Sequence, residues 1–100
     1  MSGVRFSPAA VADLDGIWDY TLEHWGAGQA EFYVREIHEC CGRLANGTLP
    51  GVDASDIRDD YSKQFTGRHV IYFRRTAEDT IDVVRILHQA MDATTRLSGP

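Results

Sequence analysis

The chain has 100 residues, of which 43% are hydrophobic and 25% are charged, and its formal net charge is −5. This composition is typical of one globular domain spanning residues 1–100 and excludes a largely disordered chain, while the negative charge disfavours a general nucleic-acid binder, which needs cations to displace counterions from phosphates. No apolar run approaches the roughly 20 residues that span a bilayer, and the N-terminus has no apolar signal segment, so we expect a cytoplasmic protein that does not bind membranes.

The beginning of the chain predicts a short strand followed by a long helix. Residues 4–7 are β-inclined, and Ser7 followed by Pro8 is typical of a helix start, with serine as the N-cap and proline at the first helical position. From Val11 to Trp25, apolar residues recur at spacings of three, four and seven, which indicates one amphipathic helix.

A second helix follows the break at residues 26–28, which contains two glycines. Its apolar positions from Ala30 to Leu44 fall on one side, while glutamates and arginines four residues apart alternate on the other side. Asn46 and Gly47 are typical of a helix end, and they close this helix.

The second half of the chain predicts a loop over residues 47–60 and then a β-sheet. Three antiparallel strands are expected at residues 61–66, 69–75 and 81–88, followed by a tail from about residue 94. The order β-α-α-β-β-β indicates an α+β fold of two layers, in which a helical hairpin packs on a mainly antiparallel four-stranded sheet. The first strand must also join this sheet, and pairing it beside the last strand would make a compact layer, but the sequence does not determine its register.

Arg85 is the residue of the sheet that most needs an explanation. Strict alternation places it on a face shared with Val83 and Leu87, and an arginine in such an apolar strand needs a carboxylate, a carbonyl or a solvated groove. Two interpretations remain open. Arg85 either belongs to a cationic sheet face that meets phosphate or an acidic partner, or it forms a structural pair with an aspartate such as Asp82 or Asp92.

His88 ends the same strand and has the chemistry of a general acid or base near neutral pH. The sequence nominates no second titratable group beside it, so a structural histidine is the alternative. The adjacent Cys40 and Cys41 match no zinc-site spacing and are interpreted as small apolar residues in a reducing compartment. We therefore expect no catalytic residue, no cofactor and no metal ion.

Several segments resemble the ParE toxins of the RelE/ParE superfamily, in order and over nearly the whole chain. The first is Phe-Ser-Pro-Ala-Ala-x-Ala-Asp-Leu-x-x-Ile-Trp at residues 6–18, and the others are Trp25-Gly26, Gln29-Ala-x-x-Tyr33, Gly67-Arg-His-Val-Ile-Tyr-Phe-Arg74 and Ile81-Asp-Val-Val-Arg-Ile-Leu-His-Gln-x-Met-Asp92. The ending Arg-Ile-Leu-His-x-x-Met-Asp is the most specific of them.

The resemblance implies a toxin of a bacterial type II toxin–antitoxin system that inhibits DNA gyrase and forms a hetero-oligomer with a ParD-like antitoxin, without chemistry of its own and without specific nucleic-acid binding alone. RelE-like relatives instead cleave mRNA in the ribosome with lysine, arginine and histidine or tyrosine. Here Lys63 is the only lysine and His88 is followed by glutamine, so RNA cleavage is the alternative rather than the leading hypothesis. A third hypothesis is a degenerate toxin that survives only as an antitoxin sink.

Two binding surfaces follow from this interpretation. An antitoxin segment that folds on binding would use a helix-in-groove contact and strand addition at a sheet edge. We expect it beside the two helices and on the adjoining sheet face, through Ile17, Trp18, Thr21, Tyr33, Ile37, Phe73, Val84 and Ile86. We expect the target to meet Arg58, Arg68, Arg85, His88 and Met91.

Overall fold

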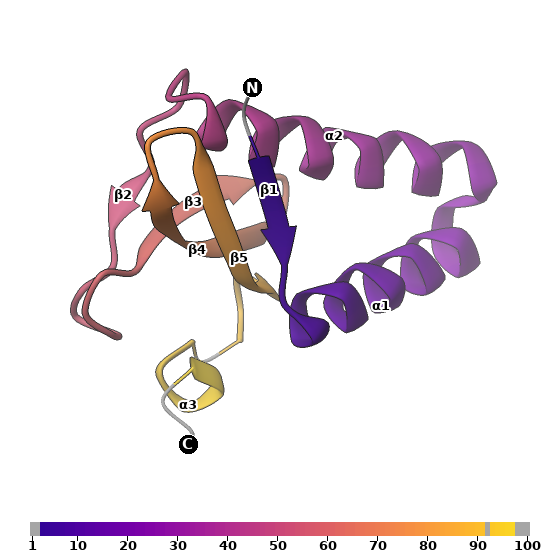
Figure 1. The fold of residues 1–100 in the computed structure, drawn as a ribbon. Coiled ribbons are helices and arrows are strands. Elements are labelled where there is room, and N and C mark those ends of the chain that lie inside the picture. Colours follow the sequence, from indigo (N-terminus) through magenta and orange to yellow (C-terminus); the bar gives the residue numbers. More distant parts are fainter. Residues whose placement is uncertain (1–2, 92, 98–100) are drawn as a thin grey trace.

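The computed structural model describes residues 3–91 and 93–97 as a two-layer α+β fold, which confirms the predicted class (Figure 1). Helices α1 (Pro8–Trp25) and α2 (Ala27–Ala45) form a hairpin that packs against a five-stranded sheet with the order β1-β5-β4-β3-β2. The strands are β1 (Gly3–Phe6), β2 (Val52–Asp53), β3 (Ser62–Thr66), β4 (His69–Ala77) and β5 (Thr80–His88). No helix of these residues is long and apolar enough to cross a membrane.

The sheet has one strand more than the sequence predicts. The additional strand, β2, consists of two residues inside the predicted loop and pairs with β3 at the sheet edge. The first strand lies beside the last one, which is the compact arrangement considered above, and β1 runs parallel to β5 from Gly3↔Thr80 to Phe6↔Val83. A parallel pair needs a long connection, and here the chain between the two strands forms both long helices and β2, β3 and β4.

Ser7 joins the start of α1 to the sheet. Its side chain accepts a hydrogen bond from the Ala10 N–H at 3.0 Å, which is the predicted N-cap, and its hydroxyl donates to the Val84 carbonyl at 2.7 Å. The Ser7 backbone N–H also donates to the Val83 carbonyl at 3.0 Å. The residue that begins the helix therefore also fixes the position of that helix against β5.

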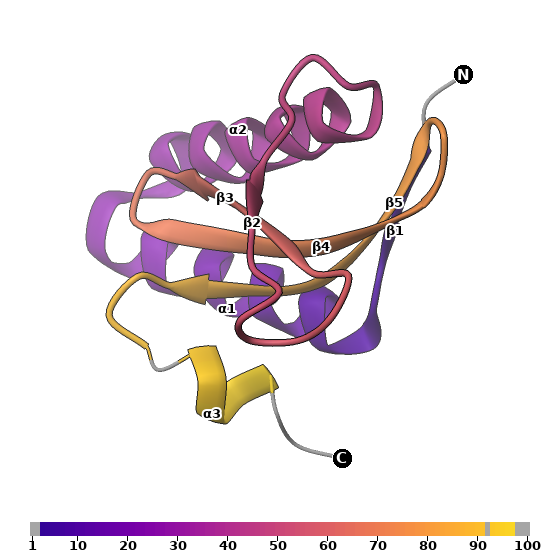
Figure 2. The ribbon, with the colours of Figure 1, turned by 90° about the vertical axis from the view of Figure 1, so that its left-hand side faces the viewer.

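Both faces of the sheet are covered. The face toward the helices carries the larger core, which includes Ile37, Ile71 and Phe73. The opposite face packs against the loop before β3 and against α3 (Ala93–Leu97), whose Leu97 is only 5% exposed. Figure 2 shows α3 away from both long helices, beyond the end of β5. The segment predicted as a tail thus contains a packed helical turn, and its last residues, 98–100, lie outside the described part.

A β-bulge in β5 changes which residues share a face. Tyr72 pairs with Arg85 but Phe73 pairs with Val83, so Val84 is an extra residue. Val83 consequently packs in the core beneath the helices, whereas Leu87 packs on the opposite face. The prediction that Val83, Arg85 and Leu87 share one face is wrong, because strict alternation fails across a bulge.

The cysteines have the surroundings that the sequence predicts. Cys40 and Cys41 are both buried and free. Burial raises the pKa of the Cys41 thiol to about 12, so the thiolate that reacts with oxidants or metals does not form near neutral pH.

Replacing Ser7 by alanine tests the joint between α1 and the sheet. We expect Ser7→Ala to lower the free energy of unfolding by about 1–2 kcal/mol, because the helix loses its cap and the Val84 carbonyl loses a donor. Urea denaturation measures the effect. The control is Ser55→Ala, at an exposed serine that bonds only locally to Asp53. Equal stability of the two variants would contradict this role of Ser7.

Candidate functional site

A cleft of about 900 Å³ lies between α1, the beginning of α2 and the adjoining ends of β4 and β5. Helix α1 contributes Asp13, Ile17, Tyr20 and Thr21 to its lining, and α2 contributes Tyr33. The strands and the turns that adjoin them contribute Arg68, His69, Arg85, Ile86, His88 and Met91.

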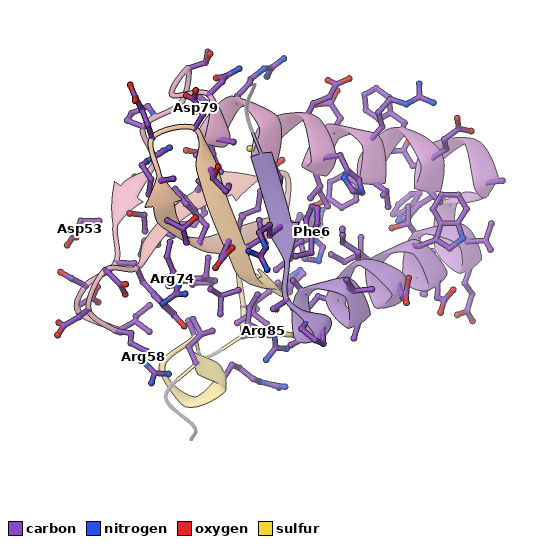
Figure 3. All side chains as sticks on the ribbon, in the orientation of Figure 1. Phe6, Asp53, Arg58, Arg74, Asp79 and Arg85 are labelled. Atoms are coloured by element: carbon purple, nitrogen blue, oxygen red, sulfur yellow. The ribbon has the colours of Figure 1, made fainter. Side chains whose placement is uncertain are left out.

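An ion pair between Asp13 and Arg85 forms the corner of the cleft. The Arg85 Nε and Nη2 donate to the two Asp13 carboxylate oxygens at 2.8 and 2.9 Å, and the Ile86 backbone N–H donates to the same carboxylate at 2.8 Å. The two side chains are only 14% and 23% exposed, and the hydrogen bonds to Asp13 raise the pKa of Arg85 above its ordinary value. Figure 3 shows Arg85 beside the first turns of α1. The pair fastens α1 to β5.

The carboxylate partner of Arg85 is not the one predicted. Asp82 instead lies 3.4 Å from the Arg74 Nη2 and 4.0 Å from the Arg5 Nε. Asp92, the other predicted partner, lies outside the described residues. Of the two interpretations of Arg85, the structural pair is therefore correct in kind, but its aspartate comes from α1.

Tyr33, His69 and His88 form a cluster of aromatic rings in the wall of the cleft, joined by a hydrogen bond and by an edge-to-face contact. The Tyr33 hydroxyl oxygen lies 2.6 Å from the His69 Nδ1 and accepts the Arg68 backbone N–H at 3.2 Å. The His69 and His88 rings meet edge to face with centroids 5.4 Å apart. The His88 Nδ1 accepts the Ala90 N–H at 3.1 Å, which leaves its Nε2 for a ligand or for solvent.

Burial favours the uncharged forms of two members of this cluster, His69 and Tyr33. The pKa of His69 is lowered, first by burial and then by the neighbouring His88, while Asp13 partly offsets both. The pKa of Tyr33 is raised by burial. His69 is therefore a neutral ring that can accept the Tyr33 hydroxyl proton at its Nδ1.

The structure brings the two predicted surfaces together. Four residues of the expected antitoxin surface line the cleft, namely Ile17, Thr21, Tyr33 and Ile86. Four residues of the expected target surface line the same cleft, namely Arg68, Arg85, His88 and Met91. That both sets share one site could not be predicted from the sequence, because they come from α1, α2, β5 and the turns around it.

The other five predicted residues lie elsewhere. Ile37 and Phe73 are 0% and 1% exposed in the core, so neither is available to a partner. Val84 packs on the opposite face of the sheet, because it is the extra residue of the bulge. Trp18 is 37% exposed on α1 but does not line the cleft. Arg58 lies near α3, where its Nη1 donates to the Leu97 carbonyl at 3.4 Å (Figure 3).

Sequence reasoning left out several residues that line the cleft. They are Tyr20, Trp25, Gln29, His69 and Arg96. The position of His69 could have been predicted from the sequence. Counting residues outward along both strands of the hairpin from its loop pairs His69 with His88. Trp25 is 71% exposed at the end of α1, and no local pattern distinguishes such a residue from a core tryptophan.

The chain is similar to known toxins along most of its length. The family model described as "ParE toxin of type II toxin-antitoxin system, parDE" matches residues 4–93. The chain is 46% identical over 91 residues to "Toxin ParE1" of Mycobacterium tuberculosis, which covers 91% of this chain and 93% of that protein. It is 34% identical over 97 residues to "Toxin ParE1" of Caulobacter vibrioides, which covers 97% of this chain and 99% of that protein.

A solved structure has the same fold. A chain of the structure described as "Chromosomal ParDE TA system from P. aeruginosa" superposes with a TM-score of 0.71 and covers 88% of this chain and 96% of that chain. The sequence identity of 22% makes this a likeness of fold alone.

Removing the Asp13 carboxylate tests the fastening of α1 to β5. Asp13→Ala leaves the Arg85 guanidinium and the Ile86 N–H without their acceptor, so we expect a loss of roughly 2–4 kcal/mol in the free energy of unfolding. Thermal and urea unfolding measure it, with Asp15→Ala at an exposed position of the same helix as the control. The double variant Asp13→Leu with Arg85→Met should regain part of the loss, because it buries no unpaired charge.

The lowered pKa of His69 predicts a dependence of stability on pH. Because unfolded His69 binds a proton near its ordinary pKa of 6.5 and folded His69 resists it, the free energy of unfolding should fall as the pH drops below 6.5. The loss should be complete once the pH is below the folded pKa. Unfolding measured between about pH 5 and 7, above the range in which carboxylates titrate, should show a flatter profile for His69→Gln than for the unaltered chain. His24→Gln, at an exposed histidine of α1, should keep the slope.

Proposed function

Because the chain belongs to the ParE toxin family of type II toxin–antitoxin systems, we propose that it inhibits DNA gyrase and that a ParD-like antitoxin neutralises it. The chain is the toxin component of such a system. Gyrase and the antitoxin are both cytoplasmic proteins, so the toxin would act in the cytoplasm. Inhibition would proceed by protein–protein contact, without a reaction carried out by the toxin.

The Asp13–Arg85 pair is the observation that carries this proposal. An arginine that stabilises a phosphate during RNA cleavage must present its N–H groups to the phosphate oxygens. Arg85 commits its Nε and one Nη to Asp13, and the pair is largely buried. The charge of Arg85 is therefore offset within the protein, which supports a structural role for this residue in a toxin that acts by contact.

The Tyr33–His69–His88 cluster supports a second candidate function, cleavage of mRNA in the ribosome. It supplies the second titratable group that His88 needs for acid–base chemistry, and Arg68 is exposed beside it. The lysine expected of RelE-like enzymes has no counterpart in the cleft. Lys63 lies on β3 with its Nζ 5.8 Å from the Phe65 ring centroid. Inhibition of gyrase is therefore the better-supported function.

Two parallel assays of the purified toxin decide between these functions. We expect loss of gyrase supercoiling activity and accumulation of cleaved plasmid, whereas mRNA on translating ribosomes should remain intact. Toxin mixed beforehand with its ParD-like antitoxin is the control and should leave gyrase active. Cleaved ribosomal mRNA together with unaffected supercoiling would replace the proposed function by the second candidate. A toxin inactive in both assays that still binds the antitoxin would identify the degenerate form.

A further inference from the structure

Helix α1 carries a row of exposed apolar side chains on the side away from the cleft. Val11, Trp18 and Leu22 are 45%, 37% and 41% exposed, and none of them lines the cleft. Because each residue of a helix turns the chain by about 100°, spacings of seven and four place these three side chains within roughly 40° of one another. Asp13 and Tyr20, which line the cleft, lie on the opposite side of the helix. We call this apolar row the outer stripe.

A row of carboxylates runs beside the outer stripe. Asp15, Asp19 and Glu23 are all exposed and follow one another at intervals of four residues, and α1 contains no lysine or arginine. Among the residues that the structure describes, none forms an ion pair with these three carboxylates. Like charges at this interval destabilise a helix. The acidic row therefore destabilises α1 in the unbound toxin, and a cationic partner would relieve the repulsion.

The outer stripe and the acidic row together select the kind of partner. An amphipathic helix with a basic flank would place its apolar side on the outer stripe and its lysines or arginines beside the acidic row. A second copy of the chain does not fit, because two α1 helices packed through their outer stripes would bring two unpaired acidic rows together. The same carboxylates would repel nucleic-acid phosphates and anionic lipid head groups.

We propose that the outer stripe of α1 binds a basic amphipathic helix of a partner protein, with Trp18 as the central apolar contact and the acidic row as the charge partner. Trp18 lies between Val11 and Leu22 on the stripe, and a tryptophan at the centre of an interface contributes more to binding than most of its neighbours. The inference goes beyond inhibition of gyrase, because it assigns Trp18 to a surface separate from the cleft.

The test uses two synthetic helical peptides without tryptophan, which share one row of leucines and carry either lysines or glutamates on its flank. Fluorescence anisotropy of the labelled peptides, titrated with purified toxin, should show that the lysine peptide binds about tenfold more tightly, with an advantage that shrinks as salt is added. In the variant Trp25→Phe, Trp18 is the remaining tryptophan, and its emission should shift to shorter wavelength when the lysine peptide covers it. Equal affinity of the two peptides, or an unchanged Trp18 emission, would overturn the proposal.

A charge variant separates a binding role of the acidic row from a structural one. Asp19→Lys places a cation four residues from both Asp15 and Glu23, so it should raise the urea midpoint of unfolding and yet weaken binding of the lysine peptide about tenfold. The control Glu78→Lys makes the same change of charge at an exposed position in the turn between β4 and β5, and it should leave binding unaltered. Equal weakening by both variants would mean that net charge causes the preference, which contradicts the assignment to α1.

Two further variants distinguish the outer stripe from the cleft. Leu22→Gln, at an exposed residue of the stripe, should weaken binding of the lysine peptide severalfold, whereas Tyr20→Gln, at an exposed residue of the same helix that lines the cleft, should not. Equal losses in the two variants would contradict the proposed surface. Neither titration contains gyrase, so failure of the proposed target and failure of this surface are observed separately.

Discussion

The carboxylate of Asp13 is the contact on which the arrangement of this toxin depends. β1 covers the edge of β5 only as far as Val83, and the chain then turns into α1. From that point Asp13 takes the place of a neighbouring strand, since it accepts both the Ile86 backbone N–H and the Arg85 guanidinium. A helix thus lies against a strand edge that would otherwise be bare. The cleft exists because α1 is held there, with its C-terminal half extending past the paired part of the sheet (Figure 1).

The same contact determines what Arg85 can do. Burying a guanidinium costs several kcal/mol unless a well-oriented partner offsets it, and the twofold hydrogen bond to Asp13 is such a partner. An arginine satisfied in this way stabilises the fold and contributes little charge to the cleft. Arg68 and Arg96 are exposed where they line the cleft, so they are better placed than Arg85 to recognise a partner. The residue that draws attention in the sequence is consequently the least available of the three.

The sequence predicts those parts of the fold that follow local rules. Ser7-Pro8 starts α1 and Asn46 follows α2, because caps act within one helical turn. The β4–β5 hairpin is also predictable, since its register follows from a short loop. The partner of Arg85 cannot be predicted by such local rules, because Asp13 lies 72 residues earlier in the chain. No local sequence pattern predicts the bulge at Val84 either. After the bulge, each residue of β5 points to the face opposite to the one that strict alternation assigns to it.

Net charge is an average that conceals how the ionisable residues are distributed. α1 contains no arginine or lysine, and its exposed Asp15, Asp19 and Glu23 lie outside the cleft. That side of the helix is therefore acidic, whereas the cleft on the side that faces β5 is lined by the exposed Arg68 and Arg96. Charges of opposite sign on two sides of one helix restrict the orientations in which a charged molecule can approach. The acidic composition that argues against nucleic-acid binding is therefore consistent with arginine side chains in the lining of the cleft.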